Sequence, residues 1–569
     1  MFVAAASNAQ GVVRILDPQG LSHALQSPSQ LALQLLGLPM PKSMHLIFVG
    51  LISLSFVATT VAQTRLGASF QGGQALTESS HHPGQSQLVA TRSAFVSERR
   101  ESSVVPSKDS ARPNILLLFA DDQRNHTLGC AGHPIVQSPH IDQLASEGVR
   151  FENAFVTTST CWVSRACLFT GCYERKHLYR VTPGPLDPDL CRSSYFSVLK
   201  KAGYRTGHLG KEHVAISNSS AAAMFDVRRK LGRNPYFKKQ DDGSERHETQ
   251  ILGDWAVEFL NEQPKNQPFC LQLSFNATHA EDRDKRPGIG HYPWPKVTDG
   301  MYDNQQMPQP RLNAPAIYDA QPDFLKNSIN RERYFWRWDT PEKYQTNMRA
   351  YYRMISGIDH VVGRLVRQLE KLKLADNTII IYTADNGYYL GDRGFAGKWT
   401  HYEQSLRVPL IIYDPRLPNE QQGRVLEEIA INSDLASTMI EFAGLPKPAS
   451  HTGRSLVPLV QGQNVIDWRT DFLCEFLAIP KTIPRWEGVR GTRWVYARYF
   501  VDGPDQTPHE FLYDLEKDPD QLNNLAGDNK SASALEKMRA RCDALIAETG
   551  PAMNAIPPHQ PTPRKKKTP

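Results

Sequence analysis

Apolar residues in the middle of the chain form short continuous runs that alternate with longer segments of helical spacing. The run at 114–120, NILLLFA, is apolar throughout, as expected for a strand that is buried on both faces of a sheet. Other segments join a helical pattern to a following apolar run, at 138–155, 194–210, 251–277 and 354–384. This alternation predicts an α/β fold with a mainly parallel sheet and helices on both faces.

The pattern changes after about Pro446. Short aromatic segments typical of antiparallel strands are followed by one amphipathic helical segment. These segments lie at 471–476, 492–500, 510–515 and 533–548. We therefore expect a large domain at 112–445 and a smaller α+β subdomain at 446–550. Residues 551–569 are rich in proline and basic side chains, and we expect them to form a disordered basic tail.

Residues 44–62 have the features of a signal peptide. Their apolar core, 46–57, is too short to span a bilayer comfortably, and small residues up to Ala62 fit a cleavage site. Cleavage would give a secreted or periplasmic protein with no stable membrane insertion. An uncleaved membrane anchor is the alternative.

The segments on either side of this peptide lack the pattern of a folded domain. Residues 1–43 form a doubtful N-terminal extension, and our hypothesis is that translation starts at Met40 or Met44. Residues 63–111 are rich in Ser, Gln and Gly without apolar periodicity, which predicts a disordered linker.

Charge and cysteine content exclude several classes of function. Arg564–Lys567 supply four charges of a net charge of +6, so the rest of the chain is nearly neutral. Because no basic stretch with interleaved aromatic residues is present, we expect no nucleic-acid partner. The eight cysteines show neither a CxxC pair nor zinc-ligand spacing, which argues against a zinc domain or a small disulfide scaffold.

Acidic and amide residues follow two of the expected strands directly. Asp121 and Asp122 come after the apolar run at 114–120, and Asp385 and Asn386 come after the apolar run at 377–384. Ligands of open α/β sheets bind beyond the carboxyl ends of the strands, and oxygen donors without His or Cys suit a hard cation such as Ca²⁺ or Mg²⁺. The alternative is that each pair only caps a following turn or helix.

Cys161 stands at the expected start of a helix, and Arg165 follows one turn later on the same side. Free backbone N–H groups at a helix start together with a fixed guanidinium form a pocket for a tetrahedral oxyanion. The alternative is a buried structural cysteine beside a surface arginine.

The segment 161–171, CWVSRACLFTG, resembles the signature C/S-x-P-S-R-x-x-x-x-T-G of the type I (formylglycine-dependent) sulfatases, which belong to the alkaline-phosphatase-like superfamily. Five further blocks resemble that family in the family's order. They are RPNILLLFADDQ, AGYRTGHLGKEH, PFCLQLSFNATH, the long block from TADNGYYLG to RVPLII, and FLYDLEKDPDQLNNLA.

The resemblance implies an alkaline-phosphatase-like α/β/α sandwich and a smaller C-terminal domain with an antiparallel sheet and a helix. It also implies that a formylglycine-generating enzyme oxidises Cys161 to formylglycine. One Ca²⁺ per chain would be held by residue 161 together with Asp121, Asp122, Asp385 and Asn386.

Roles for six side chains follow from the same resemblance. The residue at 161, as an aldehyde hydrate, would attack sulfur, and Arg165 would stabilise it. Lys211 and Lys398 would bind the sulfate. His279 would protonate the leaving alcohol, and His213 would assist release of sulfate.

The implied activity is that of an arylsulfatase-like sulfuric ester hydrolase that acts on a sulfated carbohydrate or another sulfate ester. A phosphate or phosphonate ester hydrolase and a non-catalytic protein that binds sulfated glycans are the alternatives. Val163 stands where the family usually has proline, so the maturation of Cys161 could be limited. Arg175, Lys176 and His177 are candidate contacts of a polyanionic sugar, and a solvated basic cluster is the alternative. The elaborated loop region at 281–345 is a candidate for binding and specificity.

Overall fold

The computed structural model describes residues 5–7, 13–15, 112–282, 290–477 and 482–557. The chain divides into two compact units, 1–103 and 104–569. In the first unit, β1 (Ala5–Ser7) and β2 (Val13–Ile15) pair in antiparallel orientation. The expected signal peptide and linker lie outside the described residues. Among the helices that are described, none combines the length and the apolar character needed to cross a membrane.

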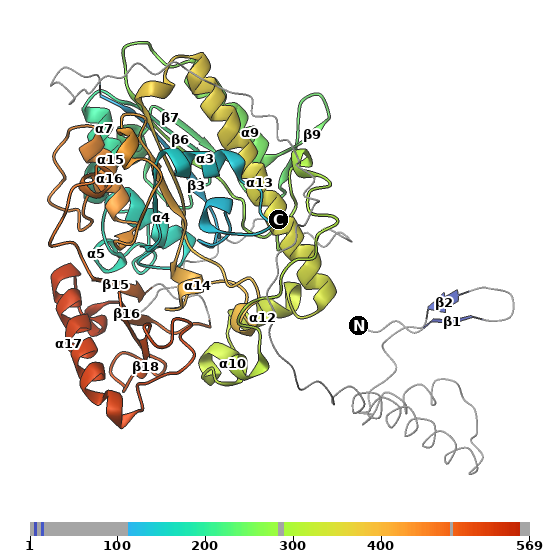
Figure 1. The fold of residues 1–569 in the computed structure, drawn as a ribbon, viewed down its shortest axis with the longest axis vertical. Coiled ribbons are helices and arrows are strands. Elements are labelled where there is room, and N and C mark those ends of the chain that lie inside the picture. The colour runs from blue at the N-terminus through green and yellow to red at the C-terminus, as the bar shows by residue number, and fades with distance from the viewer. Residues whose placement is uncertain (1–4, 8–12, 16–111, 283–289, 478–481, 558–569) are drawn as a thin grey trace, which may run out of the picture. The chain divides into compact units, whose positions relative to one another are not determined.

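An eight-stranded mixed sheet forms the centre of the second unit (Figure 1). Five of its strand pairs are parallel, and only β12 runs antiparallel to both of its neighbours, so the prediction of a mainly parallel sheet is confirmed. In order across the sheet the strands are β13 (Arg424–Leu426), β4 (Val149–Phe151), β12 (Leu410–Tyr413), β11 (Thr378–Ala384), β3 (Asn114–Ala120), β10 (Phe269–Ser274), β6 (Arg205–Gly210) and β7 (Val227–Lys230).

Helices cover both faces of this sheet, as the sequence predicts (Figure 1). One layer contains α3 (Pro139–Glu147), α9 (Glu248–Asn261) and α13 (Pro341–Lys371), and the other contains α4 (Cys161–Thr170), α7 (Tyr195–Lys201) and α15 (Asp434–Phe442). Strands β3 and β11 are buried along their whole length, which explains their continuous apolar sequences.

Short helices and strands complete the part of this unit that surrounds the eight-stranded sheet. The helices are α5 (Glu174–His177), α6 (Pro188–Arg192), α8 (Asn218–Met224), α14 (Glu403–Leu406) and α16 (Val457–Val460). The strand pairs are β5 (Ala154–Phe155) with β14 (Ala430–Ile431), and β8 (Phe237–Lys239) with β9 (Glu245–His247). The expected loop region at 281–345 also contains the helices α10 (Pro315–Asp319), α11 (Asp323–Lys326) and α12 (Ile329–Arg337).

The C-terminal part is an antiparallel sheet of four strands with α17 (Ala532–Thr549) packed against it. Its strands are β15 (Asp471–Phe476), β16 (Trp486–Gly491), β17 (Trp494–Tyr499) and β18 (His509–Asp514). The sequence analysis predicted β15, β17, β18 and the helix and missed β16. A small antiparallel sheet with one helix is therefore the architecture expected for this part of the chain.

The expected disorder of the tail is wrong for residues 551–557. Met553 and Ile556 are buried and pack in one cluster with Val163 of α4. The side chain of Arg485 donates to the carbonyl oxygen of Ile556 at 3.3 Å. Apolar burial and these backbone contacts hold the segment, and residues 558–569 lie outside the described part.

Arg175 of α5 joins the main sheet domain to the C-terminal sheet. Its Nε donates to Glu475 Oε2 at 2.7 Å, and its Nη2 donates to Glu487 Oε2 at 2.9 Å. Arg175 is fully buried, and His177 is buried with its Nε2 3.3 Å from Cys167 Sγ. The expectation that these two residues contact a sugar is therefore wrong, and only Lys176 of the three is exposed.

Replacing Arg175 by Met should lower the free energy of unfolding by about 3–5 kcal/mol, because Glu475 would stay buried without a counter-charge. Burial already raises the pKa of Glu475, and Arg175 opposes that rise. The double variant Arg175→Met/Glu475→Gln should recover part of the loss, since Glu487 keeps Arg498 as a partner at 2.6 Å. Denaturant unfolding measures both variants. Equal stability of the single and double variants would contradict this account.

Candidate active site

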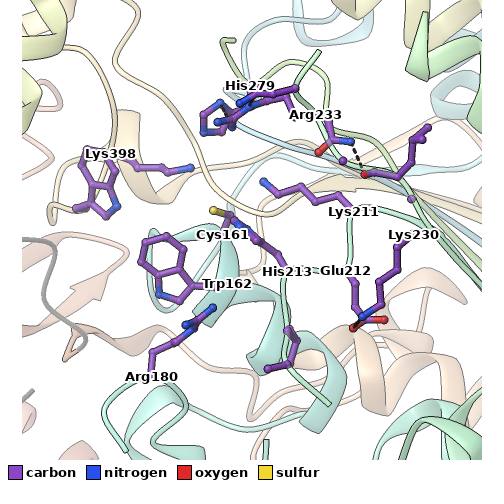
Figure 2. A pocket seen from close by; sticks show the side chains of 18 of the residues that line it. Cys161, Trp162, Arg180, Lys211, Glu212, His213, Lys230, Arg233, His279 and Lys398 are labelled. Carbon is purple, nitrogen blue, oxygen red and sulfur yellow. Dashed lines mark hydrogen bonds and ion pairs between the residues drawn. The ribbon is translucent and has the colours of Figure 1, made fainter. Parts of the chain in front are cut away.

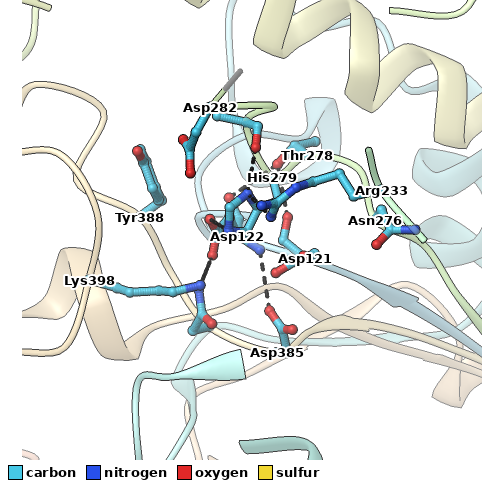
Figure 3. A network of polar contacts seen from close by, with 12 residues as sticks. Asp121, Asp122, Arg233, Asn276, Thr278, His279, Asp282, Asp385, Tyr388 and Lys398 are labelled. Atoms are coloured by element: carbon cyan, nitrogen blue, oxygen red, sulfur yellow. Dashed lines mark hydrogen bonds and ion pairs between the residues drawn. The ribbon is translucent and has the colours of Figure 1, made fainter. Parts of the chain in front are cut away.

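The carboxyl ends of β3 and β11 deliver their polar residues to one place. The two strands pair in parallel with Ala384 opposite Ala120, so the residues that follow them emerge side by side. The backbone N–H of Asp122 donates to Asp385 Oδ1 at 3.3 Å (Figure 3). All three aspartates and Asn386 are buried. The predicted cluster of oxygen donors at this sheet edge is therefore present.

The start of α4 brings Cys161 to this cluster. Its Sγ, one carboxylate oxygen of Asp121 and one of Asp385 all lie within 4.8 Å of one another. Cys161 is the first residue of the helix, and Thr160 before it is extended. The cysteine therefore lies where unpaired helix N–H groups favour an anion.

Arg165 lies one turn further along α4 and is fully buried, so it is not a surface arginine. Its Nε donates to Asp385 Oδ2 at 2.8 Å, and its Nη1 donates to the carbonyl oxygen of Lys211 at 2.7 Å. The guanidinium lies over the ring of Phe119, 4.7 Å from the ring centre. Arg165 thus fixes the orientation of a carboxylate in the cluster and adds a buried positive charge to it.

Two buried lysines also reach the aspartates. Lys211, just after β6, forms an ion pair with Asp121, and its Nζ lies 3.9 Å from Asp385 Oδ2. Lys398 forms an ion pair with Asp122 (Figure 3). Burial alone would lower the pKa of Lys398, but Asp122 and its neighbours raise it above the ordinary value. Lys398 therefore stays charged.

The pKa values of two carboxyl groups in the cluster are shifted in opposite directions. Burial raises the pKa of Asp385 to about 7, and the neighbouring charge of Asp121 adds to the rise. Burial also acts on Asp121, but Lys211 and the other cations outweigh it and hold the pKa of Asp121 well below its usual range. Two carboxylates this close cannot both ionise cheaply unless further positive charge is supplied.

Three oxygens of the cluster fit a bound cation. Asp121 Oδ1, Asp122 Oδ2 and Asn386 Oδ1 are buried without a hydrogen-bond partner. The amide nitrogen of Asn386 donates to Asp122 Oδ1 at 2.7 Å, so the amide oxygen is the atom left over. Buried acceptors without partners are costly, and carboxylate and amide oxygens are preferred ligands of Ca²⁺ and Mg²⁺. The residues present therefore fit a hard divalent cation.

Two histidines border the same site. His279 lies shortly after β10, and its Nε2 is 3.6 Å from Asp122 Oδ2. Burial and the neighbouring Arg233 hold the pKa of His279 well below its usual value. His213 packs edge-to-face on Trp162 with 5.9 Å between ring centres, and partial burial together with Lys211 lowers its pKa. Both imidazole rings are therefore harder to protonate in this structure than a free imidazole.

A pocket of about 910 Å³ opens onto this cluster (Figure 2). Five of the six predicted catalytic side chains line it, and Arg165 is not among the lining residues. The five are Cys161, Lys211, His213, His279 and Lys398. The sequence analysis indicated Arg333 only through the loop region at 281–345, and it missed other lining residues, namely Trp162, Arg180, Lys230, Arg233 and Trp399. Among the missed residues, only Trp162 and Trp399 had a usable signal, because each adjoins a predicted catalytic residue.

Family models match almost the whole of this unit. The sulfatase model matches residues 113–445, and the model described as N-sulphoglucosamine sulphohydrolase, C-terminal, matches residues 391–548. The two matches overlap at residues 391–445, which follow β11.

Two named relatives resemble the chain over about three quarters of its length. An N-acetylglucosamine-6-O-sulfatase of Bacteroides thetaiotaomicron is 26% identical over 74% of this chain and 84% of the relative. An arylsulfatase of Clostridium perfringens is 26% identical over 75% of this chain and 93% of the relative.

A solved structure has the same fold. It is a complex with the substrate D-glucosamine-2-N,6-O-disulfate, and it superposes with a TM-score of 0.64 at 25% identity, covering 78% of this chain and 99% of that one. Since the sulfatase model spans more than half of the chain, this protein belongs to the sulfatase family and is a sulfuric ester hydrolase.

Proposed function

We propose that this sulfatase cleaves sulfate esters of carbohydrates with a formylglycine made from Cys161 and one Ca²⁺. The observation that carries the proposal is the position of Cys161 Sγ among buried oxygens of Asp121 and Asp385. The donor atoms are oxygens rather than imidazole nitrogens, which favours Ca²⁺ over the transition metals.

The hydrated aldehyde would supply a nucleophilic hydroxyl, and bound Ca²⁺ would lower the pKa of that hydroxyl and polarise the sulfate. Asp121, Asp122, Asp385 and Asn386 would hold the ion with their oxygens. Arg165 keeps Asp385 oriented through the 2.8 Å hydrogen bond from its Nε.

The remaining side chains would bind the sulfate and move protons. Lys211 and Lys398 would turn from the aspartates toward the sulfate oxygens and offset their charge. His279 would donate a proton from Nε2 to the leaving oxygen, and His213 would accept one during release of sulfate.

The shape of the pocket supports a saccharide substrate. Its volume of about 910 Å³ exceeds what a single sulfate needs, and Trp162 and Trp399 give it flat apolar walls. The relatives of this chain include an N-acetylglucosamine-6-O-sulfatase and an ulvan-active sulfatase. Because the sequence predicts a signal peptide, we infer that the protein acts on a sulfated carbohydrate outside the cytoplasm. A formylglycine-generating enzyme would first convert Cys161.

Replacing Cys161 by Ala should reduce sulfate release at least about 1000-fold, because no other side chain can form the aldehyde hydrate. Released sulfate is measured with an aryl sulfate and with a panel of defined sulfated oligosaccharides. A mass spectrum of the tryptic peptide should show formylglycine at 161 in the parent protein. Full activity of Cys161→Ala, or activity of a parent that carries only cysteine there, would contradict the proposal.

Replacing Val163 by Pro should raise the fraction of chains that carry formylglycine. Val163 is the third residue of α4, where a backbone N–H has no helical partner to lose, so proline is tolerated. Peptide mass spectrometry of protein made with a formylglycine-generating enzyme measures the fraction, and Val163→Ala is the matched control. An equal fraction in all three proteins would show that proline at this position is not limiting.

Removing divalent cations with a chelator should abolish hydrolysis of the aryl sulfate, and added Ca²⁺ should restore it better than Zn²⁺ or Mn²⁺. The same assay with an aryl phosphate separates the proposal from a phosphate ester hydrolase. Activity that survives chelation, or a preference for phosphate restored by Zn²⁺, would rule out the calcium site proposed here.

A further inference from the structure

The pocket carries more positive charge than one sulfate and its metal site require. Six cationic side chains and two carboxylates line it. Lys211 and Lys398 already pair with aspartates of the metal site. Lys230 pairs with Glu212 at 2.8 Å. The other cationic side chains that line the pocket are arginines, and the metal site does not account for them.

Arg233 is one of these arginines. Its Nη1 contacts Nδ1 of His279, and its Nε donates to Asn234 Oδ1 at 3.3 Å. Within the part of the chain that the structure describes, no carboxylate forms an ion pair with it. Because a guanidinium stays charged in proteins, Arg233 presents an uncompensated cation to the pocket.

Arg333 of α12 is only partly compensated. Its Nη2 lies 3.7 Å from Asp282 Oδ2, while Arg337 contacts the other oxygen of the same carboxylate. One carboxylate therefore serves two guanidinium groups. The Arg333 guanidinium lies over the ring of Trp399, 5.1 Å from the ring centre, which holds it at the pocket wall.

Arg233 is also well placed relative to the reacting bond. Nε2 of His279 faces Asp122 in the metal site, and Arg233 contacts the opposite nitrogen of the same ring. In the proposed function, His279 Nε2 faces the leaving oxygen. The imidazole ring would then separate Arg233 from the reacting sulfate, and Arg233 would meet a neighbouring substituent of the sugar.

We propose that Arg233 and Arg333 bind a second anionic group, a sulfate or a carboxylate, on the saccharide whose sulfate is hydrolysed. The inference rests on the proposed function and names its substrate class, a sugar with at least two negative groups. The planar guanidinium can bind either anion through two parallel N–H···O hydrogen bonds, and a mono-sulfated sugar would leave it unpaired.

The test compares matched sugars in the inactive background Cys161→Ala with Ca²⁺ present. One pair is N-acetylglucosamine 6-sulfate against N-sulfoglucosamine 6-sulfate, and the other is glucose 2-sulfate against glucuronate 2-sulfate. Calorimetry gives the dissociation constants. In at least one pair, the doubly charged sugar should bind about tenfold or more tightly, and the pair identifies whether the second anion is sulfate or carboxylate.

Adding Arg233→Gln or Arg333→Gln should bring that ratio close to one, while Arg367→Gln, an exposed arginine outside the pocket, should leave it unchanged. No preference within either pair would overturn the inference, and so would a preference that survives both substitutions. Weaker binding of both members at an unchanged ratio would overturn it too, because Arg233 would then only position His279. Failure of the proposed function is separate, since it would appear as no sulfate release by the active parent protein.

Discussion

The parallel, in-register pairing of β3 with β11 is the constraint on which the active site depends. It places Asp121 and Asp385 at one buried sheet edge, where neither carboxylate is solvated by water. Buried carboxylates that close to each other require compensating positive charge. Arg165, Lys211 and Lys398 supply part of it, and the orphaned oxygens show where a divalent ion would supply the rest. Charge compensation therefore organises four separate segments of sequence around one point.

The same principle holds the two sheets together at a distance from the chemistry. Arg175 follows the cysteine helix and is buried between Glu475 and Glu487 of the C-terminal sheet. A second buried charge network thus fixes the chain just after α4, the helix that positions Cys161. Met553 and Ile556, which follow the C-terminal helix, also pack in one cluster with Val163 of α4, so this segment supports the helix that carries the proposed nucleophile.

Sequence reasoning predicted the parts of the structure that depend on local pattern. Continuous apolar runs identified β3 and β11, and the residues directly after them identified the oxygen cluster. It missed β16, whose sequence contains two glycines and two charged residues, and it missed the burial of Arg175, because a basic residue after a helix looks solvated until its distant partners are known. Arg233 had no local signal at all, and Arg333 was indicated only by its place in the loop region at 281–345, since only the folded chain puts both side chains on the pocket wall.

The central claim is that one hard cation lies between the ends of β3 and β11, against an oxygen at position 161. A high-resolution crystal structure of the matured protein, grown with Ca²⁺ and recorded with anomalous data, tests it most directly. The account predicts one ion about 2.3–2.6 Å from oxygens of Asp121, Asp122, Asp385 and Asn386, and an oxygen rather than sulfur on residue 161 facing it. Lysine nitrogens in place of the ion, or an unmodified cysteine pointing away from it, would contradict the account.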